Sequence, residues 1–72
     1  MKYMVVIEKS DAGYGAYVPD LPGCIAAGDT ETEVRQLIEE AISFHVEGLI
    51  ENGEPVPVPC SSSIFIDVQT AA

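Results

Sequence analysis

The sequence predicts an α+β fold with the element order βββαβ, in which one long helix covers one face of a four-stranded mixed sheet. Three observations lead to this prediction. Three short segments within residues 2–28 are rich in β-branched, aromatic or small side chains, and turn residues separate them. A stretch of roughly 22 residues then carries apolar side chains at helical spacing. A last apolar segment follows a proline-rich connector at 55–59.

The first predicted strand runs from Lys2 to Lys9, a segment too short for a stable helix. A turn at 10–13 contains an Asp and a Gly and leads into the second strand, Tyr14 to Val18. The third strand, Cys24 to Gly28, consists of small residues and is expected to run antiparallel to the second.

The connection between the second and third strands cannot be regular structure, because its two prolines remove backbone donors and its glycine permits a tight reversal. Its residues are Pro19, Asp20, Leu21, Pro22 and Gly23, and together with Cys24, the first residue of the third strand, they form a signature turn. Turn geometry explains these residue types, so a structural corner is favoured over a binding loop, which stays the alternative.

The helix is predicted from its two ends and its apolar stripe. Thr30 and Glu33 have the spacing of a capping box, and Asn52-Gly53 supplies a left-handed stop that Pro55 reinforces. The stripe comprises Val34, Leu37, Ile38, Ala41, Ile42, His45 and Leu49.

The last strand, Ile64 to Val68, is expected to return parallel to the first, which gives the sheet order 3-2-1-4. One helix covers one face of such a sheet, yet both faces carry apolar side chains. The second face is therefore predicted to be an interface for self-association. The residues assigned to it are Met4, Val6, Tyr17 and Phe65.

Composition narrows the possible functions. Twelve acidic residues against three basic ones give a net charge of −9, which argues against direct binding to nucleic acid or to a membrane surface. An acidic surface suits a basic protein partner instead. The acidic helix residues predicted to contact it are Glu39, Glu40, Glu47 and Glu51.

The 72 residues are expected to form a single domain, residues 1–72, whose small core needs help from another copy, as a dimer or tetramer. Neither a signal peptide nor a run of about 18 apolar residues is apparent, so a cytoplasmic protein with reduced cysteines is expected.

Four kinds of catalytic, metal or phosphate site are conceivable, and each has a simpler structural explanation. Glu8 and Asp67 could approach each other on neighbouring strands and hold a metal, but further ligands are not evident. His45, Cys24 and Cys60 lack zinc-site spacing. The serines at 61–63 lack a nucleophile elbow, and the glycines lack the register of a phosphate loop. No catalytic residue, metal or cofactor is therefore predicted.

Four stretches of the chain resemble the N-terminal domain of HicB-type antitoxins. They are residues 3–9 (YMVVIEK), 13–24 (GYGAYVPDLPGC), 28–30 (GDT) and 52–57 (NGEPVP). The resemblance covers almost the whole sequence, and the PDLPGC stretch is its most specific part.

The resemblance implies a partial RNase H fold of the βββαβ type, self-association, and binding to a small basic HicA-type toxin that cleaves mRNA. Inhibition would be steric, by occlusion of the toxin's catalytic histidine surface. Many family members continue into a DNA-binding module, whereas this sequence ends at Ala72, so operator binding is not expected. An orphan oligomeric module without a toxin, and a residual metal-dependent nuclease, remain alternatives.

Overall fold

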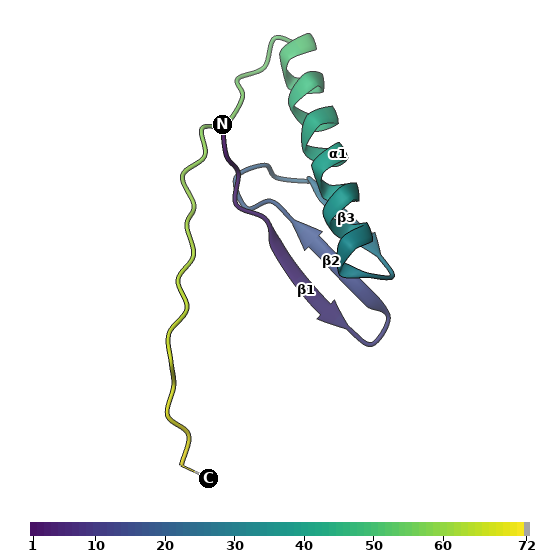
Figure 1. The fold of residues 1–72 in the computed structure, drawn as a ribbon. Coiled ribbons are helices and arrows are strands. Elements are labelled where there is room, and N and C mark those ends of the chain that lie inside the picture. Colours follow the sequence, from purple (N-terminus) through teal and green to yellow (C-terminus); the bar gives the residue numbers. More distant parts are fainter. Residues whose placement is uncertain (72) are drawn as a thin grey trace.

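The computed structural model describes residues 1–71 and contains an antiparallel three-stranded sheet followed by one helix (Figure 1). The strands are β1 (Val6–Ser10), β2 (Gly13–Tyr17) and β3 (Ile25–Gly28), in the order β1-β2-β3. The helix α1 spans Glu31–Glu51. The predicted α+β class, the meander and the single long helix are confirmed. Residue 72, the last of the predicted domain, lies outside the described residues.

The turn between β1 and β2 depends on Gly13. This residue has φ +130°, and a Cβ placed on it would lie 2.6 Å from the carbonyl oxygen of Gly28 on the other side of β2. Ser10 pairs directly with Gly13, so the reversal is tight and sets the register of the hairpin.

Both helix ends follow the sequence signals. The Thr30 hydroxyl accepts a hydrogen bond from the Glu33 amide at 3.1 Å. The Glu33 carboxylate reaches back to the amide of Asp29 at 3.4 Å, one residue before the cap. At the other end Gly53 has φ +69°, and the Glu54 amide donates to the Leu49 carbonyl at 2.8 Å, as in a Schellman motif.

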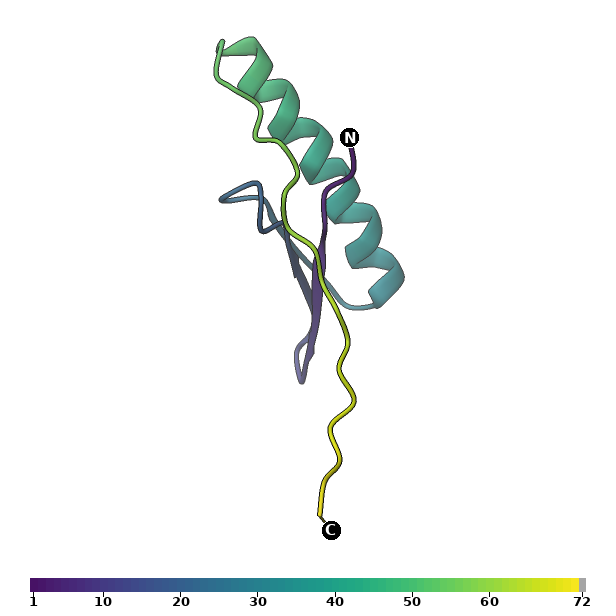
Figure 2. The same ribbon diagram turned by 90° about the vertical axis from the view of Figure 1, so that its left-hand side faces the viewer.

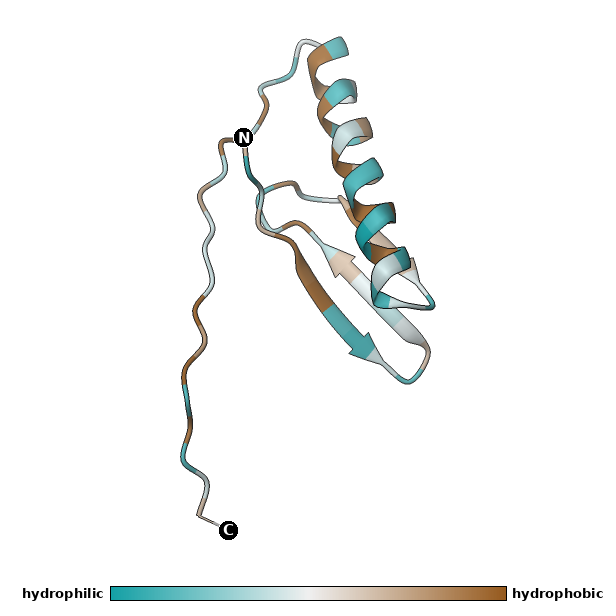
Figure 3. Cartoon of the chain, viewed as in Figure 1, coloured by the Kyte–Doolittle hydropathy of each residue, from teal (hydrophilic) through white to brown (hydrophobic). Residues whose placement is uncertain are grey.

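The helix packs mainly over β3 and β2, and its apolar side faces the sheet (Figure 3). The C-terminal part of α1 projects beyond the strands (Figure 1). The core cluster joins β2, the corner after it and the first half of α1. Its buried residues are Ala16, Val18, Leu21, Cys24, Val34 and Ile38.

The predicted fourth strand does not form in this chain. No helix or strand is present in residues 54–71, so the sheet order stops at 3-2-1 instead of reaching 3-2-1-4. After Ser61 the segment runs as an extended chain that leaves the sheet behind (Figures 1 and 2). We call residues 61–71 the tail. Its apolar residues are exposed by 73–102%: Ile64, Phe65, Ile66 and Val68.

Two contacts explain why residues 64–68 do not pair with β1 in this chain. The Tyr3 hydroxyl donates to the Pro57 carbonyl at 2.5 Å, and Asp20 binds the amides of Cys60 and Ser61. The chain is thus fixed near the start of β1, and the tail diverges from the β1 edge beyond that point (Figure 1). Among the described helices, none is long and apolar enough to cross a bilayer.

Candidate interaction surfaces

The sheet face opposite the helix presents an apolar row across all three strands. Val6 pairs with Tyr17, and Tyr17 pairs with Ile25, so these three side chains share one face. The neighbouring row, built on buried Ala16, faces the helix instead. Tyr17 is 41% exposed and Ile25 70% exposed. We call this side the open face.

Two of the predicted interface residues, Val6 and Tyr17, therefore lie directly opposite each other on the open face. Met4 precedes β1 and is half-buried. Phe65 is not part of the sheet, because it lies in the tail and is fully exposed. Ile25 was missed from the sequence, although its pairing with Tyr17 in an antiparallel meander would have placed it on this face.

Three of the four predicted acidic residues form one stripe on α1. At about 100° per residue, Glu40, Glu47 and Glu51 fall within an arc of about 40°. Phe44 lies beside them and is 79% exposed. We call the surface formed by Glu40, Phe44, Glu47 and Glu51 the acidic stripe. The sequence signal for Phe44 is an aromatic side chain at a position outside the apolar stripe.

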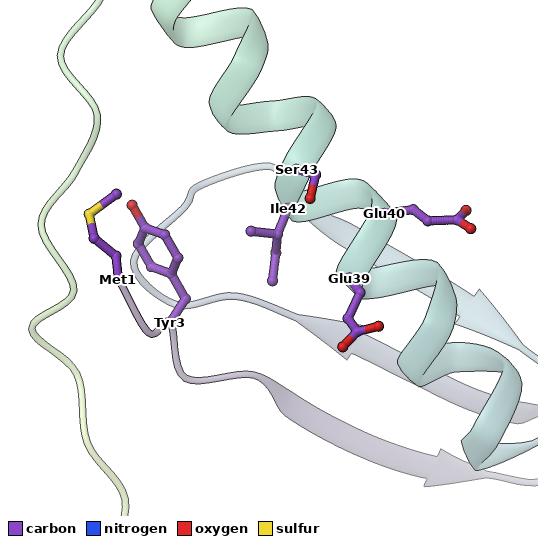
Figure 4. A pocket seen from close by; sticks show the side chains of 6 residues that line it. All are labelled: Met1, Tyr3, Glu39, Glu40, Ile42 and Ser43. Carbon is purple, nitrogen blue, oxygen red and sulfur yellow. The ribbon is translucent and has the colours of Figure 1, made fainter.

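Glu39 lies apart from the acidic stripe. It lines a groove of about 490 Å³ between the N-terminal segment and the helix. Figure 4 shows Ile42 directed from α1 toward Tyr3, whereas the side chain of Glu40, which also lines this groove, extends away from Tyr3. The four glutamates are all exposed, but they do not form a single cluster. The groove is lined by Met1, Tyr3, Glu39, Glu40, Ile42 and Ser43.

The corner after β2 is closed by its own backbone. Leu21 donates to the Val18 carbonyl at 3.1 Å, Cys24 donates to the Leu21 carbonyl at 3.0 Å, and Val18 donates to the Cys24 carbonyl at 3.2 Å. Gly23 supplies a positive φ of +86°. Leu21 and Cys24 point into the core, and burial raises the pKa of the Cys24 thiol. Pro19 and Pro22 are exposed.

Asp20 points the other way and holds the start of the tail. One carboxylate oxygen, Oδ2, accepts from the Cys60 and Ser61 amides at 3.0 and 2.9 Å. The other, Oδ1, accepts from the Ser61 hydroxyl at 2.7 Å and the Cys60 thiol at 3.2 Å.

These four bonds are associated with shifted pKa values of the Asp20 carboxyl and the Cys60 thiol. The bonds from Ser61 and then Cys60 hold the pKa of the Asp20 carboxyl well below its usual range. The Cys60 thiol has its pKa raised, first by its hydrogen bond to Asp20 and then by the negative charge of that carboxylate. Sequence reasoning missed this contact, since no local pattern connects residues 20 and 60.

The catalytic hypotheses find no assembled site in the part of the chain that is described. Glu8 lies on β1 and Asp67 in the tail, which does not pair with β1. Across residues 1–71, no group of three or more His, Cys, Asp or Glu side chains is placed to hold a metal ion. His45 is half-buried on the helix, and both cysteines are free.

Known proteins are similar to this chain in sequence. The chain is 51% identical over 57 residues to an uncharacterised 14.9 kDa protein from the rep-hol intergenic region of Haemophilus phage HP1. That alignment covers 79% of this chain and 43% of the phage protein, so the chain spans less than half of that relative. A UPF0150 protein of Synechocystis is 48% identical over 76% of this chain and 71% of its own length.

A solved structure shares the fold as well. A chain of the HicA3 and HicB3 toxin-antitoxin complex superposes with a TM-score of 0.67 and 35% identity, over 82% of this chain and 72% of that one. A family model described as the HicB-like antitoxin of bacterial toxin-antitoxin systems matches residues 3–70. With its three-stranded meander, capped helix and closed PDLPGC corner, the chain belongs to the HicB-like antitoxin family.

Proposed function

We propose that this HicB-like antitoxin neutralises a small basic HicA-type toxin, an mRNA-cleaving protein, by steric occlusion, and that it does so as a self-associated, non-enzymatic protein. The observation that carries the proposal is the likeness to a chain of the HicA3 and HicB3 toxin-antitoxin complex, at 35% identity over 82% of this chain. A net charge of −9 supports a basic partner, because opposite charges speed and orient association.

The acidic stripe is the toxin-contacting surface in this proposal. Aromatic side chains are enriched in protein–protein interfaces, whose rims are polar. Phe44 provides the aromatic side chain, and Glu40, Glu47 and Glu51 provide the rim. Glu39 would contact the partner only where the toxin reaches around the helix toward the groove beside Tyr3.

Self-association would use the open face. Val6, Tyr17 and Ile25 form an apolar row that ends at the β1 edge, and Met4 continues it toward the N-terminus. A monomer of this size gains little stability from its own core, so burial of this row against another copy would stabilise the fold as well.

Co-expression with a small basic toxin-like reading frame from the same gene neighbourhood tests the antitoxin role. Growth should be restored, and the two proteins should co-elute on size exclusion. Absence of both rescue and complex would overturn the proposal, and absence of such a reading frame would favour the orphan module.

A matched pair of variants tests the acidic stripe. Phe44→Ala should weaken the complex by roughly thirtyfold, the loss expected of a hot-spot residue worth about 2 kcal/mol. Ile50→Ala is the control, because Ile50 is also exposed (62%) but lies about 120° from Phe44 around the helix. Equal effects of the two substitutions in isothermal titration calorimetry would argue against the stripe.

A further inference from the structure

The chain exposes far more surface than a protein of its mass should. Its accessible surface is 5796 Å², whereas a folded monomer of 7.7 kDa is expected to expose about 4,300 Å². Its radius of gyration is 14.8 Å, against about 11 Å for a compact chain of this length. The tail contributes to this excess, since it extends away from the sheet and helix (Figures 1 and 2).

The tail is apolar where a strand was predicted. Ile64, Ile66 and Val68 alternate with Phe65 and Asp67, and the four apolar side chains are at least 73% exposed. In an extended chain the side chains of Ile64, Ile66 and Val68 lie on the same side. Such a segment is unstable in water on its own and is a ready partner for an open sheet edge.

The sheet offers such an edge at β1. Within the described chain β1 pairs with β2 alone, and its outer backbone groups are left free for a further strand. The helix lies mainly over β2 and β3, so the helix side of β1 is incompletely covered. A hollow of about 290 Å³ opens there, lined by Val5, Ile7 and Ile38, with Arg35 and Glu39 at its rim.

The anchors direct the tail away from its own edge. The Tyr3–Pro57 bond and the four bonds of Asp20 to Cys60 and Ser61 fix the chain where the tail begins. Beyond these anchors the tail diverges from β1 (Figure 1). The tail is thus a strand-forming segment that does not pair within its own domain, and the β1 edge is unpaired. Exchange of an identical element between two copies requires these two features.

We propose that two copies of this chain exchange their tails, so that Ile64–Val68 of each copy adds to the β1 edge of the other. Each sheet then gains its fourth strand in the order 3-2-1-4, parallel to β1. Ile64, Ile66 and Val68 fill the hollow beside Val5 and Ile7. This arrangement rests on the self-association proposed above, but it places the contact at the β1 edge and on the helix side of β1, so it does not require burial of the open face.

The exposed area suits this exchange. The excess of about 1,500 Å² per chain exceeds the roughly 800 Å² that each partner buries in a standard interface. Main-chain hydrogen bonds along the edge would add affinity, and the alternating side chains would add register.

The mass in solution gives the first test. Wild type should scatter light as a dimer, twice the 7.7 kDa chain mass, at micromolar concentration. Ile66→Asp should give monomers that keep their circular dichroism spectrum, because Ile66 is 73% exposed and lies outside the core. Thr70→Asp adds the same charge to the tail outside the strand and should remain dimeric. A monomeric wild type overturns both exchange and self-association.

Disulfide crosslinking distinguishes exchange from other modes. In a Cys60→Ser background, Glu8→Cys on one chain and Asp67→Cys on another place thiols on neighbouring strands of the exchanged sheet. An equimolar mixture should form a heterodimeric disulfide in excess of the crosslinking that either variant shows alone.

The same two substitutions in one chain give the complementary result. Exchange predicts crosslinked dimers on a denaturing gel, whereas a strand that folds back on its own β1 gives a crosslinked monomer. Dimeric mass without the heterodimeric crosslink would overturn the exchange and leave the antitoxin proposal standing, because neither measurement involves a toxin.

Discussion

Asp20 accepts four hydrogen bonds from Cys60 and Ser61, residues that lie 40 and 41 positions further along the chain. Its neighbour Leu21 is fully buried in the core. Two consecutive residues thus perform two tasks: one holds the helix against the sheet, and the other fixes the departure of the tail. The corner that contains them is a structural junction between the core and the C-terminal segment.

Replacing Asp20 should release the tail without unfolding the domain. Asp20→Asn removes the charge and one of the two accepting oxygens, so we expect amide hydrogen exchange at Cys60 and Ser61 to accelerate roughly tenfold. Asp67→Asn, which makes the same chemical change in the tail, is the control and should leave these amides unaffected. NMR exchange rates decide the matter, and unchanged protection in Asp20→Asn would contradict the anchor.

The same carboxylate gives a pH dependence with a defined sign. The folded-state pKa of Asp20 is lowered, so the anchor stabilises the structure at any pH above the unfolded value of about 3.9. Its contribution is lost as the pH falls from that value through the lowered folded pKa. A ¹³C titration of the Asp20 carboxyl should therefore have its midpoint well below about 3.9. A midpoint at or above that value would contradict the hydrogen bonds described.

Leu21 should dominate the stability of the core. Truncating a fully buried leucine costs about 2–5 kcal/mol, comparable to the whole stability expected of a domain this small. Leu21→Ala should thus be largely unfolded at 25 °C in urea titrations followed by circular dichroism. Val58→Ala is the matched control, since Val58 is 76% exposed and should cost less than about 0.5 kcal/mol.

At the scale of elements, alanine substitutions at two turn glycines distinguish the cost of backbone strain from the cost of a steric clash. Gly23 has φ +86° with open space around it, so Gly23→Ala should cost about 1–2 kcal/mol through backbone strain. Gly13 combines φ +130° with a backbone oxygen 2.6 Å from the added Cβ, so Gly13→Ala should cost clearly more. Equal melting temperatures for the two variants would show that the β1–β2 turn can shift.

Local signals predicted the elements that depend on local interactions. The cap at Thr30, the stop at Gly53 and the reversal at Gly13 each depend on residues within a few positions, and the structure contains all three. The segment Ile64–Val68 has an equally clear strand pattern but no strand, because a strand also needs a partner edge. The sequence cannot state whether that edge is in the same chain.

The surfaces were predictable to different extents for similar reasons. The assignment of Val6 and Tyr17 to one sheet face followed from alternation along the strands, whereas their direct pairing was not predicted. Glu39 was grouped with Glu40 because both lie largely off the predicted apolar stripe, yet about 100° of helix rotation separates them. The Asp20 anchor depends on a contact 40 residues away, which neither periodicity nor turn chemistry reveals.

At the scale of the whole molecule, the net charge of −9 acts in opposite directions on the two proposed associations. Two copies repel each other, whereas a basic toxin is attracted. Because the Debye length falls from about 10 Å at 0.1 M salt to about 3 Å at 1 M, added salt should strengthen self-association and slow toxin binding.

Sedimentation and stopped-flow measurements over this salt range would check both directions. The association rate with toxin should fall about tenfold or more, while the dimer dissociation constant decreases. If both associations weaken in parallel, charge does not control them as proposed, and apolar contacts with a different salt response would have to be invoked for one of the two.

The consecutive packing of β1, β2, β3 and α1 has a kinetic consequence. Each element packs chiefly on elements close to it in sequence, so little chain entropy is lost before contacts form. The meander and helix should therefore fold quickly as a unit, independently of concentration. Docking of residues 64–68 onto a second copy would follow, at a rate that rises with protein concentration. Newly synthesised protein would therefore pass through a monomeric intermediate with exposed apolar side chains, and the lifetime of this intermediate would shorten as the protein concentration rises.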